Sequence, residues 1–106
     1  MATVNIVNCP VGVARNTTGL PSALDDNYAS ITVTSTGASS PVAITAKDYG
    51  SNGGAWVITV TGNSVYIKFG RGTPVATDQD LLILDGQTRE FWARPGDSIA
   101  VLDVPV

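Results

Sequence analysis

The most regular alternation of apolar and polar positions lies between residues 56 and 104. In the run Val65–Phe69 at its centre, the first, third and fifth residues are apolar, while Tyr66 and Lys68 fall between them. Successive side chains of a β-strand point to opposite faces of the sheet, so this alternation predicts a half-buried strand. Further apolar runs separated by short turn signals lie on both sides of it. We therefore expect this run to be one strand of a folded-over sheet.

Seven other segments carry a strand pattern, and short turn signals such as Asn52-Gly53 and Pro95-Gly96 stand between several of them. They are Thr3–Val7, Ala29–Thr34, Val42–Ala46, Trp56–Val60, Leu81–Leu84, Thr88–Arg94 and Ser98–Val104. No segment has the period of a helix of useful length. About eight strands with a turn every 8–12 residues in the second half predict an all-β fold. We expect an antiparallel β-sandwich or barrel that forms a single domain over residues 1–106.

The segments on either side of Asp85-Gly86 make the most specific predictions. Leu81–Leu84 is continuously apolar, which predicts burial on both faces, by a second sheet or by a partner. Asp85-Gly86 predicts a tight turn that pairs this run with Thr88–Arg94 as a hairpin. Phe91 and Trp92 are adjacent in a strand, so they point to opposite faces. One ring is expected in the core, and the other against a partner or a covering loop.

Residues 8–28 keep neither the strand period nor the helix period. Two prolines and two glycines interrupt them, and a loop of about 20 residues is uncommon in a compact domain. We expect a long irregular N-terminal segment here. It would be either an arm lying along a neighbouring subunit or a surface loop covering one end of the domain.

The chain is poor in charge, which bears on how its surface is used. Of 106 residues, 14% are charged, against about 25% in typical soluble domains. Such a surface suits a protein packed against neighbours, although a Thr- and Ser-rich β surface without a partner has the same composition. Sandwich edges carry unpaired backbone groups, and few charges are present to block them. We therefore expect a homo-oligomer, either a trimer or a dimer.

Charge and hydropathy also argue against two classes of partner. The formal net charge is −3, and the six basic residues form no run, so nucleic-acid binding is not expected. There is no stretch of 18 apolar residues, and hence no expected membrane span. The N-terminus lacks the pattern of a signal peptide, which favours synthesis in the cytoplasm. Cys9 is the one cysteine and cannot form an intrachain disulfide.

The residue types needed for common catalytic and metal sites are scarce. The chain has no histidine, so neither a Ser-His-Asp nor a Cys-His arrangement can be built, and zinc lacks its usual ligands. Carboxylates at Asp25-Asp26, or at Asp78 and Asp80, could pair, and the latter two could contribute to a calcium site. Asp is also common in loops for its local hydrogen bonds. We expect no enzymatic activity, no cofactor and no bound metal.

Aromatic and aliphatic side chains in or near the strands are the candidates for an interface. Exposed Trp and Tyr on a β scaffold can stack on sugars or act as hot spots of a protein interface. The candidate interface residues are Tyr28, Tyr49, Leu81, Ile83, Phe91 and Trp92.

One family resemblance covers somewhat under half of the chain. Its carrying residues are Val65–Gly70, Thr73–Thr77, Leu82–Gly86 and the turn Pro95–Asp97 followed by Ser98–Leu102. The stretch from about Trp56 to Leu102 resembles a module of small virion proteins of tailed bacteriophages, including capsid decoration (cement) proteins. The resemblance implies a non-enzymatic structural protein of the virion, made in the cytoplasm of the bacterial host. Its partner would be the major capsid protein or another virion protein, to which it binds as an oligomer, stabilising the shell.

A second function class stays open beside this one. The chain could be a carbohydrate-binding or adhesive β-module of a phage tail or receptor-binding apparatus. A glycan binder should show a cleft with an exposed aromatic residue flanked by Asp, Asn or Arg. A protein that binds a shell should instead offer a broad, flat and weakly charged surface.

Overall fold

The computed structural model describes residues 1–13, 19–21, 28–50 and 53–105, which form β-strands and contain no helix. The strands are β1 (Thr3–Val13), β2 (Gly19–Pro21), β3 (Ala29–Thr34), β4 (Ser40–Thr45), β5 (Gly54–Thr61), β6 (Val65–Arg71), β7 (Leu81–Ile83), β8 (Thr88–Ala93) and β9 (Asp97–Asp103). Every predicted strand segment overlaps one of them, and β2 is the added one. The all-β prediction is confirmed.

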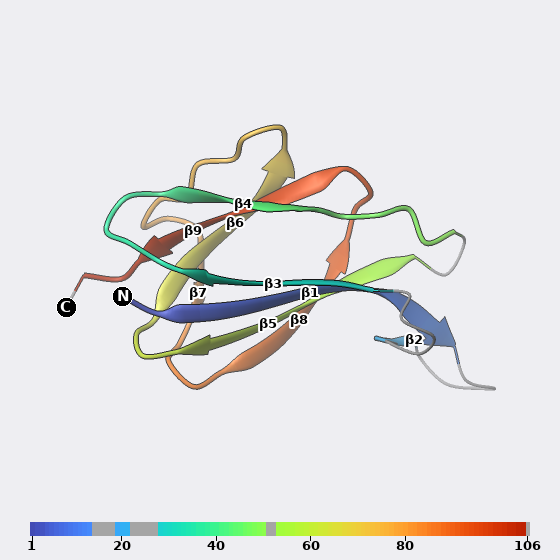
Figure 1. Ribbon diagram of the computed structural model, residues 1–106, viewed down its shortest axis with the longest axis horizontal. Helices are drawn as coiled ribbons and strands as arrows, with labels where there is room; N and C mark the ends of the chain where they lie inside the picture. The colour runs from blue at the N-terminus through green and yellow to red at the C-terminus, as the bar shows by residue number, and fades with distance from the viewer. Residues whose placement is uncertain (14–18, 22–27, 51–52, 106) are drawn as a thin grey trace.

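The strands form two antiparallel sheets that face each other as the layers of a sandwich (Figure 1). Sheet 1 has the order β3-β1-β5-β8, with β2 beside the far end of β1, and sheet 2 has the order β4-β9-β6-β7. β3 pairs with β1, β4 with β9, β5 with β8 and β6 with β7. If β1 is counted after β9, the first strand of this series pairs with the last, the second with the next to last, and so on inward. This nested pairing is that of a jelly roll, with the N-terminal strand in the place of the last strand.

The core lies between the sheets and follows directly from the alternation along the strands. Trp56, the largest buried side chain, is fully enclosed, and its ring stacks on Phe69 of β6 with 6.3 Å between centroids. Its fully buried aliphatic neighbours are Val4, Ile6, Ile58, Val60, Val65, Ile83 and Ile99. Burial of each large apolar side chain stabilises the fold by about 1.5–3 kcal/mol.

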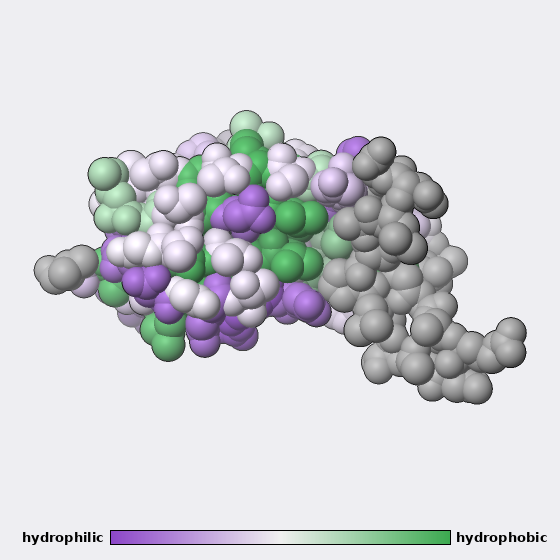
Figure 2. All heavy atoms as spheres, turned by 60° about the horizontal axis from the view of Figure 1, so that its bottom comes forward, coloured by the Kyte–Doolittle hydropathy of each residue, from purple (hydrophilic) through white to green (hydrophobic). Residues whose placement is uncertain are grey.

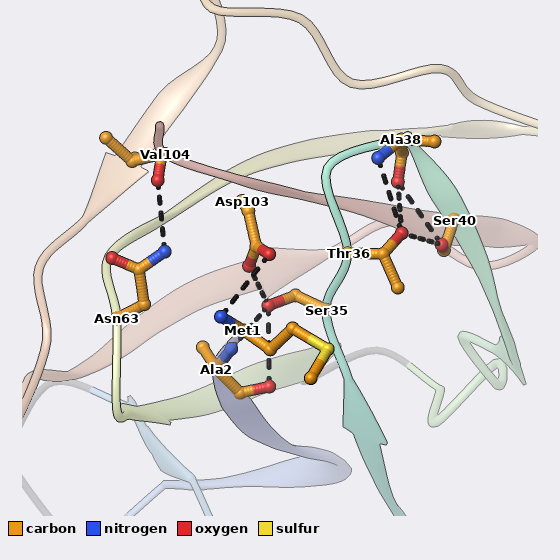
Figure 3. Close-up of polar contacts among 9 residues, drawn as sticks. All are labelled: Met1, Ala2, Ser35, Thr36, Ala38, Ser40, Asn63, Asp103 and Val104. Atoms are coloured by element: carbon orange, nitrogen blue, oxygen red, sulfur yellow. Dashed lines mark hydrogen bonds and ion pairs between the residues drawn. The ribbon is translucent and has the colours of Figure 1, made fainter. Parts of the chain in front are cut away.

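The start of β1 and the end of β9 lie side by side (Figure 3). The amino group of Met1 is 3.6 Å from the carboxylate of Asp103, at the end of β9. The buried hydroxyl of Ser35 donates a hydrogen bond to the same carboxylate and accepts one of 2.8 Å from the backbone N–H of Ala2. This cluster holds the start of β1 against the end of β9, as the nested pairing requires.

The prediction of an irregular segment over residues 8–28 is wrong for part of its length. Strand β1 continues to Val13, and β2 pairs with this extension. The alternation was hidden because the polar Asn8 occupies a fully buried, inward-facing position. Its side chain is satisfied there, donating to the carbonyl of Ala55 at 3.2 Å and accepting from the N–H of Lys47 at 3.0 Å. The remainder of the predicted arm, residues 14–18 and 22–27, lies outside the described residues.

The predicted hairpin around Asp85-Gly86 is also wrong. β7 pairs with β6 in sheet 2, whereas β8 pairs with β5 in sheet 1, so this turn joins the two sheets. Backbone bonds to the end of β5 hold it: Gly86 donates to the carbonyl of Val60 at 2.8 Å, and Val60 donates to that of Gln87 at 3.0 Å. The turn therefore lies beside the end of β5 and carries the chain from sheet 2 to sheet 1, instead of reversing it within one sheet.

A second sheet does not bury Leu81–Leu84 on both faces, and burial by a partner, the other predicted possibility, stays a prediction. Only Ile83 is fully buried, while the three leucines are 43–49% exposed. The physical reason is the position of β7 at the edge of sheet 2, where it pairs with β6 alone and covers just three residues. A continuous apolar run thus marks an open edge here instead of a central strand.

Candidate functional site

Part of the outer face of sheet 2 is covered by the connection from β6 to β7, residues 72–80, whereas Leu82 on the same face is 43% exposed. Pro74 in this connection is buried and lies over Gly70 of β6, while the N–H of Ala76 donates to the hydroxyl of Ser39, just before β4, at 2.8 Å. Because β9 lies between β6 and β4, the connection must cross it. Ala100, on the outer side of β9, is accordingly 0% exposed.

Asp80 closes this connection and takes part in a turn. Its carboxylate accepts from the N–H of Thr77 at 2.7 Å and from the Thr77 hydroxyl at 3.2 Å, and it lies 3.5 Å from the Lys68 ammonium. The backbone hydrogen bond from Thr77 is the main cause that lowers the pKa of Asp80. The carboxylate of Asp78 accepts a hydrogen bond from the Gln79 side chain and does not pair with the carboxylate of Asp80. In the part of the chain that the structure describes, no group of three or more acidic, Cys or His side chains could hold a metal ion.

The outer face of sheet 1 has a different character. Strand register and the inward direction of the core residues identify the outward positions. They include Thr3, Asn5 and Val7 of β1, Ser30, Thr32 and Thr34 of β3, Val57 and Thr59 of β5, and Thr88, Glu90 and Trp92 of β8. Glu90 is the charged residue among them. Figure 2 brings this side forward and shows pale, weakly polar side chains and some strongly hydrophilic ones around a smaller apolar group. The described part of the face is weakly charged, and the outward Cys9 and Ala55 on it are buried.

Trp92 is the most prominent side chain on this face, with 72% of it exposed. Its strand partner is Ala55 of β5, whose own partner in β1 is Cys9, so small side chains lie beside the indole. The indole also lies close to Gly53, where a Cβ atom would stand 3.0 Å from its ring. Gly53 has a φ of +78°, which glycine adopts readily. A glycine and an alanine thus leave room for the indole to lie across the sheet.

Phe91 faces the other way, as the alternation predicts. It is half-buried, its ring lies 5.2 Å from that of Phe69 in the core, and the guanidinium of Arg89 lies 5.2 Å from its centroid. The same Arg89 donates to the carbonyl of Leu82 on β7 at 3.3 Å. Phe91 and Arg89 therefore close the side of the sandwich between β7 and β8, while Trp92 points outward.

The structure does not bring the other interface candidates into one site. Ile83 is fully buried in the core and is unavailable to a partner. Tyr49 is half-buried, and its hydroxyl donates to the carbonyl of Asn8 at 3.0 Å. Burial, followed by the proximity of Cys9, raises the pKa of Tyr49. Leu81, 43% exposed, belongs to the edge of sheet 2. Tyr28, 40% exposed, directly precedes β3 and so stands at the end of sheet 1.

Sequence reasoning missed the polar part of this face. The Thr, Ser and Asn residues of β1, β3 and β5 carry no chemical signal by themselves, and Val57 lies in an apolar run that resembles core. Two signals in the sequence could have indicated this face. One is the set of polar residues that alternate with the core residues in each strand, and the other is Gly53, a glycine that allows the ring of Trp92 to come close.

Comparisons with protein-family models, with curated proteins and with solved structures found no match to this chain. Among the described residues there is no helix long and apolar enough to cross a membrane.

Proposed function

We propose that this protein is a non-enzymatic structural component of a bacteriophage virion that binds the protein shell, as capsid decoration proteins do. The observation that carries the proposal is the outer face of sheet 1, which is weakly charged and bears the exposed Trp92. The resemblance of residues 56–102 to small virion proteins supplies the class of partner, the major capsid protein or another virion protein.

The energetics of protein interfaces favour this use of the face. Tryptophan is enriched among hot spots, and charged residues are depleted at the centre of interfaces. Burial of one large apolar side chain is worth about 1.5–3 kcal/mol, and many symmetry-related copies on a shell multiply that effect. The Thr and Ser residues elsewhere on this face cost less to desolvate than charged groups do. A partner surface that covers this face would have to supply a polar or positively charged group for Glu90.

The test is binding of purified protein to shells of the phage that carries it, with Trp92→Ala compared against Leu82→Ala. Both replace an exposed apolar side chain, but Leu82 lies on the outer face of sheet 2 beside Tyr66. Trp92→Ala should abolish co-sedimentation with the shells while leaving the circular dichroism spectrum unchanged, and Leu82→Ala should bind normally. Normal binding by Trp92→Ala would contradict the assignment of this face.

The exposed indole also supports the second candidate, a carbohydrate-binding or adhesive module of the tail. Trp92 has the carboxylate of Glu90 two residues away on the same face, and a sugar can stack on the ring and hydrogen-bond to the acid. Jelly rolls occur in both capsid proteins and lectins, so the fold favours neither function. Binding of the wild type to host surface polysaccharide but not to shells, with loss in Trp92→Ala, would favour this candidate.

A further inference from the structure

Three of the four lateral edges of the sandwich carry features that prevent pairing with another strand. β8 bears Glu90 and the inward-pointing Arg89, and charges of this kind protect sheet edges. β4 contains Pro41 and a shift of register between Pro41 and Thr45. β7 has just three residues. Short strands, prolines and irregular register are the other usual protections.

The fourth edge, β3, carries none of them. Its six residues, Ala29–Thr34, include no charge and no proline. They pair with β1 in unbroken register from Ala29 to Thr34, and in the described structure β1 is the strand that β3 pairs with. Four of the six are β-branched, the class that favours strands. The outer edge of β3 is therefore a regular template for one more strand.

The core is also open on this side of the molecule. Ile31 and Val33 of β3, and Ile44 of β4, pack against the core yet stay partly exposed. On the opposite side, Arg89 spans from the ring of Phe91 to the carbonyl of Leu82. A strand added beside β3 would cover Ile31 and Val33, which gives pairing at this edge a hydrophobic gain in addition to its hydrogen bonds.

We propose that the occupant of this edge is a second copy of the chain, whose β3 pairs with β3 in antiparallel orientation about a two-fold axis near Thr32. In that register Thr32 lies opposite Thr32 of the partner subunit, and Ile31 lies opposite Val33 of the partner subunit. Thr–Thr and β-branched cross-strand pairs are favourable, and no like charges meet. The same operation on β8, centred on Arg89 or Glu90, would set like charges against each other. β3 is thus the self-complementary edge.

Pairing along β3 would join the two copies of sheet 1 into one continuous sheet. Because the contact is isologous, it closes at two copies and leaves β8 as the new edge at both ends. The outer faces of the two copies, each with its Trp92, would then look in the same direction and could engage one surface together. The dimer does not depend on what that surface is, so it can be tested independently of the proposed function.

The experiment compares Thr32→Lys with Thr88→Lys by sedimentation velocity over a range of protein concentrations. The two threonines are matched: each is exposed, lies on an edge strand of sheet 1, and has its hydroxyl bonded to the adjacent strand, Thr32 to Asn5 and Thr88 to Thr59. The wild type and Thr88→Lys should form dimers. Thr32→Lys should stay monomeric at the same concentrations with an unchanged circular dichroism spectrum, because two lysines would meet at the two-fold axis.

A mixing experiment tests the register and guards against a general loss of folding. Thr32→Glu alone should also be monomeric, whereas a mixture of Thr32→Glu and Thr32→Lys chains should recover a heterodimer. Three results would overturn the proposal: a wild type that is monomeric throughout, a wild type that is trimeric, or a dimer that Thr88→Lys disrupts and Thr32→Lys does not. Failure of the mixture to associate would overturn the pairing about Thr32.

Discussion

The outer faces of the two sheets are built from similar alternating strands but differ in what lies over them. On sheet 2, residues 72–80 cross from β6 over β9 toward β4, and Ala100 beneath them is completely buried. On sheet 1, Trp92 is 72% exposed and lies beside the small residues Gly53 and Ala55. The difference teaches that covering of an outer face is local. On sheet 2 the connection buries Ala100 but leaves Leu82 exposed, whereas on sheet 1 the outward Cys9 and Ala55 are buried and Trp92 beside them is the position that a partner could use.

Residues 72–80 can cover part of sheet 2 because this connection is longer than is needed to join β6 to β7. β6 and β7 are adjacent antiparallel partners, which a tight turn could join, yet Arg71 and Leu81 are linked by the whole of residues 72–80. The extra length places Pro74 and Ala76 over sheet 2 and anchors Thr77 to Asp80. The connection between β5 and β6, residues 62–64, has no such reach.

The largest expected effect comes from placing a charge on the outer side of each sheet. Ala100→Asp puts a carboxylate beneath the covering connection and should lower the free energy of unfolding by on the order of 3 kcal/mol or more. Thr59→Asp, at the matching outward position of a central strand of sheet 1, should cost about 1 kcal/mol, because it mainly loses a hydrogen bond to Thr88. Urea denaturation measures both. Equal losses would mean that the two faces are equally covered.

A smaller effect distinguishes the inner and outer sides of sheet 1. Phe91→Ala should lower the free energy of unfolding by about 2–3 kcal/mol, because it removes a half-buried ring that contacts Phe69. Trp92→Ala should change it by less than about 1 kcal/mol, since the indole is mostly in solvent. Thermal or urea unfolding of the two variants beside the wild type provides the measurement. A large loss in Trp92→Ala would show that the indole supports the fold.

The smallest effect concerns the acid sensitivity of the covering connection. The pKa of Asp80 is lowered from its ordinary value of 3.8, first by the backbone hydrogen bond of Thr77. Its contribution to stability is therefore present above pH 3.8 and is lost as the pH falls through the lowered pKa. Asp80→Asn should be slightly less stable than the wild type near neutral pH, and the difference should vanish in strong acid. Melting temperatures of Asp80→Asn and the wild type over a pH series measure it, and a difference that persists in strong acid would contradict this role of Asp80.

Much of the local structure could be predicted from the sequence. Alternation located eight strands, identified Val65, Ile67 and Trp56 as strand residues, and required Phe91 and Trp92 to face opposite ways. These predictions succeed because the direction of a side chain in a strand depends only on its position along that strand. The candidate site was found in part: Trp92 was named, but with no indication of which of the two rings would be outside.

Only the tertiary structure decided which strands are neighbours and which faces are covered. The sequence could not tell that Asp85-Gly86 joins two sheets, that the apolar Leu81–Ile83 is an exposed edge, or that Asn8 is a satisfied inward residue of a longer strand. Alternation fixes two faces for each strand but does not say which other strand supplies the hydrogen bonds or what lies over each face. Those choices depend on contacts between residues far apart in the chain, such as Ala76 with Ser39 and Ser35 with Asp103, whose free energies are gained only when the folded chain brings these residues together.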